Sequence, residues 1–198
     1  MRADLDGTLC RLSIKWTDAQ FRYRGNTRYF TQGSIRPTVA AGLVRISKPG
    51  PNDVFYDPFC GSGTIPEERA LFPARKILAS DYKREVIWTA EQNCEGIAIV
   101  FQSDARQTPS RSESIDCIVT NPPWNRQIAV EDLRHLYAAF LAEAKRILKP
   151  NGKLWVLTDC HEELTMAARE NGLYRNAVCE LSLHGLHLKV YEIRKTSP

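Results

Sequence analysis

The stretch Asp57-Pro-Phe-Cys-Gly-Ser-Gly-Thr64 follows a short apolar run, Val54–Asp57, that predicts a buried strand. The two glycines of this loop let the backbone approach a ligand closely and leave N–H groups free where a helix is predicted from Ile65. Pro66 fits the first turn of that helix. A strand, a glycine-rich loop and a helix in this order favour a nucleotide-binding α/β domain. A tight structural turn explains the glycines alone equally well.

Short apolar runs alternate with amphipathic stretches through the rest of the chain, which predicts a doubly wound, mostly parallel sheet with helices on both faces. The predicted strands are Val54–Asp57, Lys76–Ser80, Ile97–Gln102, Ile115–Thr120 and Lys153–Leu157, and the helices are Lys83–Cys94 and Glu131–Leu148. Lys149-Pro-Asn-Gly152 predicts a turn that ends the second helix. Ala177–Leu183 and Leu186–Ile193 predict a C-terminal antiparallel hairpin.

The N-terminal part differs from the rest in charge. The chain has 198 residues, a length that suits one domain with a sizeable core. Its net charge of +4 permits a nucleic-acid partner but does not by itself predict one. We expect a basic segment over residues 1–35, with a small hairpin from Leu9–Ile14 and Gln20–Tyr23, and an α/β domain over 36–198 that opens with a helix, Arg36–Ile46. The cations Arg22, Arg24, Arg28 and Arg36 are interleaved with aromatic residues. This mixture is typical of a nucleic-acid contact surface, and a solvated face is the competing interpretation.

The cysteines and histidines argue against a disulfide-bonded protein and against a metal site. The six cysteines form no C-x-x-C pair and sit in apolar runs, so they predict reduced thiols in a cytoplasmic protein. His184 and His187 have no further ligand at metal spacing, so no metal site is expected. No apolar stretch reaches membrane-spanning length, and no membrane partner is expected.

Polar residues recur where the predicted strands end. Asp81 and Asp104 follow the second and third strands, where a doubly wound fold places groups that bind a nucleoside, although each could simply cap a helix or turn. Asn121-Pro-Pro-Trp124 follows Ile115–Thr120. The two prolines stiffen a turn that presents two acceptors, the Asn121 side-chain oxygen and the Pro122 carbonyl, and Trp124 offers a flat face for a base. Two converging acceptors suit an exocyclic amine with two N–H donors.

Together these motifs carry a family resemblance. Asp57-Pro-Phe-Cys-Gly-Ser-Gly-Thr64, Ser80-Asp-Tyr82, Ser103-Asp-Ala105 and Asn121-Pro-Pro-Trp124, in this order, resemble the class I S-adenosylmethionine-dependent methyltransferases. With the preceding stretch, residues 33–43, the chain is similar to the catalytic domain of THUMP-associated RNA guanine-N2 methyltransferases. The resemblance covers roughly residues 20–195 and implies a Rossmann-like, seven-stranded sheet whose last strand is antiparallel.

The resemblance also implies roles for individual residues. The donor's methionine part is assigned to Asp57, Cys60, Gly61 and Gly63, its ribose to Asp81, its adenine to Asp104 and Ala105, and the target base to Asn121, Pro122 and Trp124. The implied reaction transfers a methyl group to the N2 amine of guanine in tRNA or rRNA, with S-adenosylhomocysteine as the second product and no metal.

Several alternatives stay open at this point. Adenine-N6 and protein glutamine methyltransferases share the N-P-P-aromatic geometry, and a non-catalytic subunit of the same fold could bind RNA or a partner. The subfamily usually carries a THUMP domain, so RNA capture is assigned to such a domain in a longer parent chain, to the basic N-terminal segment or to an accessory subunit. The chain has Asn125 where the family commonly has glycine, which asparagine can replace in a left-handed conformation.

Overall fold

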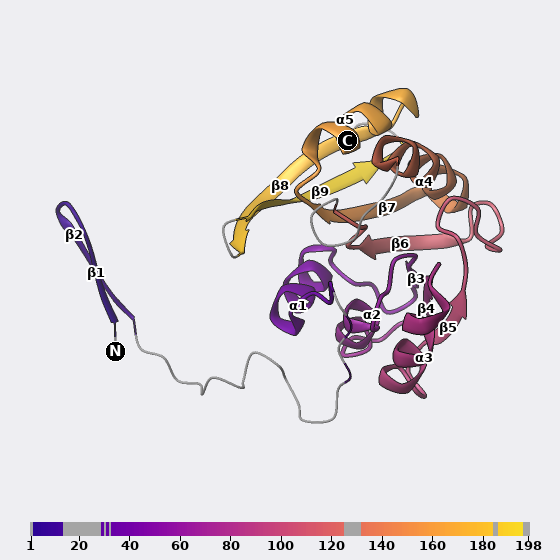
Figure 1. Ribbon diagram of the computed structural model, residues 1–198, viewed down its shortest axis with the longest axis horizontal. Helices are drawn as coiled ribbons and strands as arrows, with labels where there is room; N and C mark the ends of the chain where they lie inside the picture. The colour runs from indigo at the N-terminus through magenta and orange to yellow at the C-terminus, as the bar shows by residue number, and fades with distance from the viewer. Residues whose placement is uncertain are drawn as a thin grey trace.

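A computed structural model describes residues 2–13, 29, 31, 33–124, 132–183 and 186–195. Its main element is a seven-stranded sheet with the strand order β5-β4-β3-β6-β7-β9-β8, in which β9 runs antiparallel to both neighbours and the other pairings are parallel (Figure 1). The strands are β3 (Val54–Asp57), β4 (Lys76–Asp81), β5 (Ile99–Gln102), β6 (Ile115–Thr120), β7 (Leu148–Thr158), β8 (Tyr174–Leu183) and β9 (Leu186–Arg194). The predicted doubly wound sheet with a C-terminal antiparallel hairpin is confirmed.

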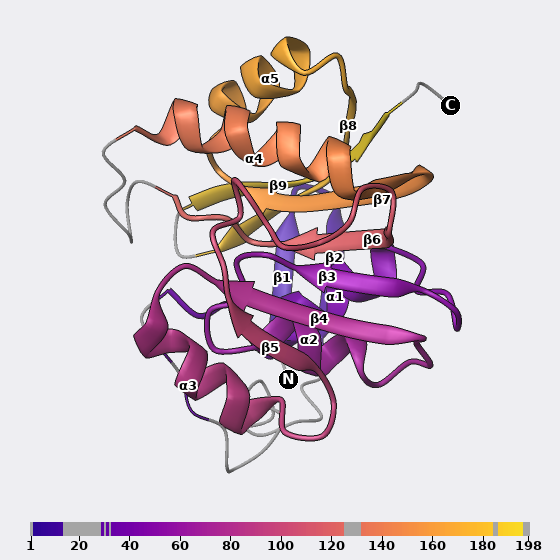
Figure 2. The ribbon, with the colours of Figure 1, turned by 90° about the vertical axis from the view of Figure 1, so that its right-hand side faces the viewer.

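Helices cover both faces of this sheet, as Figure 2 shows. They are α1 (Pro37–Ile46), α2 (Thr64–Arg69), α3 (Arg84–Asn93), α4 (Leu133–Ile147) and α5 (His161–Glu170). Successive strand residues point to opposite faces. Phe55 accordingly joins the buried cluster under α1, whereas its neighbour Tyr56 joins the cluster under α4 and α5. This burial on both faces explains why the central strands are apolar without strict alternation.

Strand β3 is the first strand of the seven-stranded sheet in sequence, and it lies beside β6. Two strands and two helices separate β3 from β6 along the chain. The chain passes from β3 outward to β5 and then returns to place β6 on the other side of β3. A crevice opens at such a reversal, outside the carboxyl ends of the strands. The glycine-rich loop after β3 and the Asn121 turn after β6 therefore meet at one edge of the sheet.

Two predicted elements need correction. Strand β7 begins at Leu148, not Lys153, and the predicted turn over residues 149–152 lies inside it. Leu148 pairs with Ile115, and the register then shifts, which accommodates the extra residues as a bulge. Gly152 fits there because a Cβ would lie 3.1 Å from the Ile115 carbonyl oxygen. Helix α5 was not predicted from the sequence.

The N-terminal residues form a separate two-stranded sheet. Here β2 (Leu9–Ser13) pairs with β1 (Arg2–Asp6), whereas the sequence suggested Gln20–Tyr23 as its partner. That expected partner lies outside the described residues. The division of the chain at residue 36 stays a prediction. Within the described ranges, no helix combines the length and the apolar character that a membrane crossing requires.

Candidate active site

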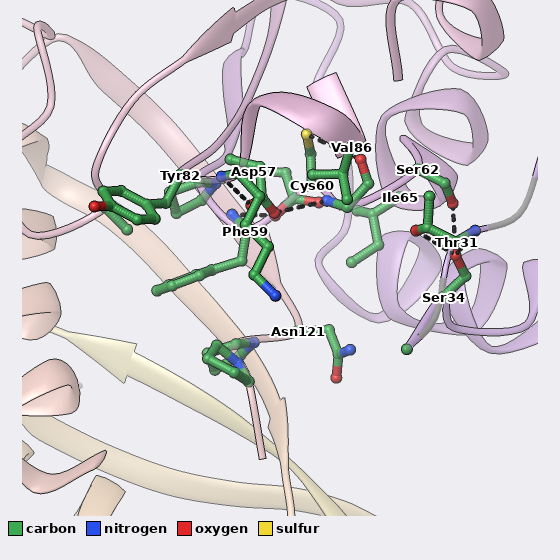
Figure 3. A pocket seen from close by; sticks show the side chains of 18 of the residues that line it. Thr31, Ser34, Asp57, Phe59, Cys60, Ser62, Ile65, Tyr82, Val86 and Asn121 are labelled. Carbon is green, nitrogen blue, oxygen red and sulfur yellow. Dashed lines mark hydrogen bonds between the residues drawn. The ribbon is translucent and has the colours of Figure 1, made fainter. Parts of the chain in front are cut away.

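A cavity of about 960 Å³ opens at the carboxyl ends of β3, β4 and β6. Figure 3 shows the loop after β3 on one side of this cavity and Asn121 across from it. Ten residues were predicted to hold a methyl donor or a target base, and all of them except Gly63 line the cavity: Asp57, Cys60, Gly61, Asp81, Asp104, Ala105, Asn121, Pro122 and Trp124. The structure therefore brings together groups that lie up to 67 positions apart in sequence, from Asp57 to Trp124.

The glycine-rich loop is fixed by the end of the neighbouring strand. The Cys60 N–H donates to the Ser80 carbonyl at 2.9 Å, and the Gly61 N–H donates to Asp81 Oδ2 at 3.1 Å. Gly61 and Gly63 have φ values of +52° and +85°, which disfavour residues with a Cβ. Gly63 is also the N-cap of α2. Its backbone conformation shapes the loop although it does not line the cavity.

Gly63 allows helix α3 to pack against the loop, so its replacement is expected to destabilise the fold. A Cβ there would lie 2.5 Å from Cys94 Sγ, which is buried. Gly63→Ala is expected to lower the free energy of unfolding by about 2–4 kcal/mol through strain and overpacking. Urea denaturation measures this change. Gly96→Ala is the matched control, because Gly96 has φ +72° and no atom within 4 Å of an added Cβ. Equal losses in the two variants would show that the Cys94 contact is not the cause.

Asp57 is a buried carboxylate with one free oxygen. Its Oδ1 accepts hydrogen bonds from Thr120 Oγ1 at 2.7 Å and from the Phe59 N–H at 3.2 Å, whereas the buried Oδ2 has no partner among the described residues. Burial raises the pKa of Asp57 to about 7, which the bond from Thr120 partly opposes. An unpaired buried carboxylate of this kind favours a cationic ligand in the cavity.

Asp81 ends β4, and its two oxygens bind the glycine-rich loop and the turn into α3. Oδ2 accepts from the Gly61 N–H, and Oδ1 accepts from the Lys83 N–H at 3.1 Å. Burial raises the pKa of Asp81, and these two backbone bonds lower it. Each carboxylate oxygen accepts two hydrogen bonds. The carboxylate lines the cavity and has acceptor capacity beyond these two bonds, which suits a ligand hydroxyl group.

Asp104 was predicted to bind the adenine of the donor, but in the structure its carboxylate pairs with Arg106. Arg106 Nε lies 3.0 Å from each Asp104 oxygen, and Arg106 Nη2 lies 2.6 Å from Oδ2. The guanidinium holds the pKa of Asp104 below its usual value. With the Arg106 N–H as a further donor at 2.9 Å, the carboxylate has its acceptor positions occupied by one residue. A ligand amine would have to displace part of this ion pair, whereas the buried neighbour Ala105 lines the cavity without such competition.

The turn after β6 carries the predicted target-base residues. The Asn121 side-chain oxygen is buried and has no hydrogen-bond partner among the described residues, although the side chain lines the cavity. Tyr137, fully buried on α4, supports the turn: its hydroxyl lies 2.8 Å from Thr158 Oγ1 and 3.5 Å from the Pro123 carbonyl oxygen. An unsatisfied buried acceptor is costly, which favours a ligand donor at this position.

Trp124 is more buried than its expected stacking role suggests. Only 7% of its surface is exposed, and it belongs to the apolar cluster that contains Leu43 and Trp155. Its Nε1 is buried without a partner among the described residues. Trp124 lines the cavity, but its burial in this cluster leaves little of its surface open for a base to stack on.

Other residues line the cavity that the sequence did not single out. Thr31, Ser34 and Ile35 enclose it from the N-terminal side. Tyr82, in the turn between β4 and α3, and His135 of α4 also line it. Tyr82 directly follows Asp81, so its position at the strand end was a usable signal. Asp132 caps α4 by accepting from the His135 N–H at 2.8 Å, and the two reach the cavity through the first turn of that helix.

The predicted RNA contacts stay a prediction. Arg36 is the N-cap of α1 and does not line the cavity, and Arg22, Arg24 and Arg28 lie outside the described residues. In the part of the chain that the structure covers, no group of three or more histidine, cysteine, aspartate or glutamate side chains is arranged to hold a metal ion.

The sheet order and the arrangement of loops around this cavity define a class I methyltransferase domain. The family model UPF0020, described as an RMKL-like methyltransferase domain, matches residues 24–189, and the chain belongs to this family. The resemblance inferred from the four motifs is thereby confirmed.

Relatives with assigned activities support this membership. A Mus musculus protein named tRNA (guanine(6)-N(2))-methyltransferase THUMP3 is 29% identical over 196 residues, which are 88% of this chain and 39% of that protein. The tRNA (guanine(6)-N2)-methyltransferase of Thermus thermophilus is 31% identical over 165 residues, 80% of this chain and 49% of that protein. The crystal structure of Thermus thermophilus TrmN matches with a TM-score of 0.73 and 30% identity, over 83% of this chain and 50% of that chain. The chain thus spans half or less of these proteins.

Proposed function

We propose that this chain is the catalytic domain of an S-adenosylmethionine-dependent RNA methyltransferase that modifies the N2 amine of guanine in tRNA or rRNA. One observation carries the proposal: the cavity joins a glycine-rich loop and strand-end carboxylates to the unpartnered acceptor of Asn121. The names of the relatives favour guanine N2 in tRNA over other amines.

The residues present fit an S-adenosyl donor. The free, buried Oδ2 of Asp57 suits a cationic group of the donor, and the loop at Cys60 and Gly61 offers backbone close to it. Asp81 would accept from the ribose hydroxyls, and Ala105 with Asp104 would border the adenine. When bound, the donor supplies a methyl group on a positively charged sulfur, so the protein needs no metal to activate it.

Donor affinity is expected to depend on pH through Asp57. Its pKa in the folded protein is about 7, raised from 3.8, so the carboxylate is protonated below neutrality and must lose that proton to pair with a cation. The dissociation constant should therefore rise as pH falls from about 7.5 to 5.5, by at most about tenfold per unit. Calorimetric titration with S-adenosylhomocysteine across this range measures it. Asp57→Asn should bind weakly with a flat profile, and an unchanged slope in that variant would contradict the assignment.

The turn after β6 is proposed to hold the target amine. Asn121 Oδ1 and the Pro122 carbonyl would each accept one N–H, which fixes the nitrogen and draws its lone pair away from the ring. Transfer forms one N–C bond, breaks one S–C bond and releases one proton from the amine to solvent. The contribution of the protein is mainly to position the two reactants, which can be worth roughly 7–11 kcal/mol in favourable cases.

Binding of the RNA chain is assigned to groups outside the cavity. Because the chain covers 39% and 49% of two tRNA-modifying relatives, we propose that RNA is held by the basic residues Arg22, Arg24, Arg28 and Arg36 together with a THUMP domain of a longer parent chain or an accessory subunit. The six cysteines are thiols and not disulfides in the described residues, which supports the proposed cytoplasmic location.

A methylation assay with parallel acceptors tests the proposal. The domain is incubated with labelled S-adenosylmethionine and unmodified tRNA, rRNA, DNA or protein, and the products are digested for mass spectrometry. We expect N2-methylguanosine in an RNA acceptor. N6-methyladenine or methylglutamine as the product would support methyl transfer but contradict guanine as the substrate. A domain that binds no donor by calorimetry would support the non-catalytic alternative.

A further inference from the structure

A short piece of chain before α1 closes one side of the cavity. We call the described residues Tyr29, Thr31 and 33–35 the strap. Thr31, Gly33, Ser34 and Ile35 belong to the cavity lining, and Figure 3 shows Thr31 and Ser34 facing Ser62 of the glycine-rich loop.

The side chain of Asn93, the last residue of α3, binds the strap and the loop at once. Asn93 Nδ2 donates to the Tyr29 carbonyl at 2.8 Å and to the Ser62 carbonyl at 2.7 Å. Asn93 Oδ1 accepts from the Tyr29 N–H at 3.1 Å. Both N–H donors of the amide and its oxygen are therefore used. The amide pairs with the Tyr29 backbone much as a neighbouring strand would.

Further contacts fasten the same junction. Ser34 Oγ lies 2.8 Å from Ser62 Oγ and 3.1 Å from Thr31 Oγ1. The Tyr29 ring also lies against the Trp88 ring on α3, with 6.3 Å between centroids. The strap is thus tied to α3 and to the loop by partners that are 28 to 64 positions distant in sequence.

From these contacts we infer that Asn93 is a positioning residue for the donor: it clamps the strap onto the glycine-rich loop and so keeps the donor pocket closed on its N-terminal side. The inference rests on the proposed donor-binding role of this cavity. Asn93 itself does not line the cavity, so it acts through Ser62 and the strap.

Asn93→Ala removes all three hydrogen bonds and leaves the cavity lining in place. We expect the dissociation constant for S-adenosylhomocysteine and the KM for the donor to rise about tenfold. The kcat at saturating donor should stay within about twofold, because the turn at Asn121 is untouched. Deuterium uptake in a peptide covering residues 29–35 should increase. Gln92→Ala is the matched control, since Gln92 is an exposed neighbour on α3.

A second variant removes a contact between the strap and the glycine-rich loop without changing Asn93. Ser34→Ala cannot disturb α3, and it should shift affinity and exchange in the same direction by a smaller factor. An Asn93→Ala affinity equal to that of Gln92→Ala overturns the inference. So does a loss of affinity with unchanged exchange at residues 29–35, because the loss would then come from α3 or the loop.

Failure of the inference is distinguishable from failure of the proposed function. A wild-type domain that binds no S-adenosylhomocysteine contradicts the proposed function, and this inference with it. Wild-type binding with unchanged affinity in both Asn93→Ala and Ser34→Ala contradicts the clamp alone.

Discussion

Asn121→Ala is expected to lower methyl transfer by roughly 10²–10³-fold while donor affinity stays within about twofold, as for the loss of one preorganised hydrogen-bonding group in an active site. The side-chain oxygen of Asn121 is buried, lines the cavity and has no partner among the described residues, so its acceptor is free for the target amine. The donor is assigned to the loops after β3 and β4, across the cavity from Asn121 (Figure 3).

Single-turnover methylation of RNA measures the first quantity, and calorimetry with S-adenosylhomocysteine measures the second. Asn151→Ala serves as the matched control, because Asn151 is an exposed asparagine of β7 that does not line this cavity. Turnover equal to that of the control would remove Asn121 from the proposed mechanism.

Asp81→Asn should weaken donor binding by about a hundredfold or more. The variant keeps the shape of the side chain but turns one oxygen into an N–H donor, which would face the N–H of either Gly61 or Lys83. It therefore loosens either the glycine-rich loop or the turn into α3, and it removes a proposed acceptor for the ribose. Hydrogen bonds to a charged group contribute about 1.5–3 kcal/mol each, so two of them account for a loss of this size.

The matched control for this change is Glu91→Gln, which neutralises an exposed carboxylate on α3. Calorimetry of both variants with S-adenosylhomocysteine separates the local effect from the change in net charge. If Asp81→Asn bound the donor as tightly as the control, the ribose would have to be assigned elsewhere.

The strands and the loops at their ends could be predicted because the signals are local. Val54–Asp57 and Ile115–Thr120 are apolar runs bounded by turn residues, and the structure has strands with the same bounds. Their polar end residues then fall at one edge of the sheet because parallel strands share a direction. The strand order places β6 next to β3, so the loops that follow these two strands lie close together.

What could not be predicted depends on packing between distant segments. The burial of Trp124 follows from the apolar cluster it shares with α1 and β7. Asn93 has no sequence signal for its role, because the backbone it pairs with is 64 positions away. The ion pair between Asp104 and Arg106 could have been predicted from the sequence. Arg106 is two positions after Asp104, so a short loop brings the two side chains together.

In its proposed role as the partner of a cationic methyl donor, the buried carboxylate of Asp57 is also expected to make the lifetime of the protein depend on methyl-donor supply. Its pKa is higher in the folded state than in the unfolded chain, so the stability of the empty domain declines as pH rises from about 4 to about 7. Near neutrality the empty domain therefore holds a partly ionised, uncompensated acid, which a bound cationic donor would neutralise. Ligands that bind only the folded state protect it from proteases in proportion to their concentration. In a cell starved of the methyl donor, we expect degradation to remove this protein faster than in a well-fed one.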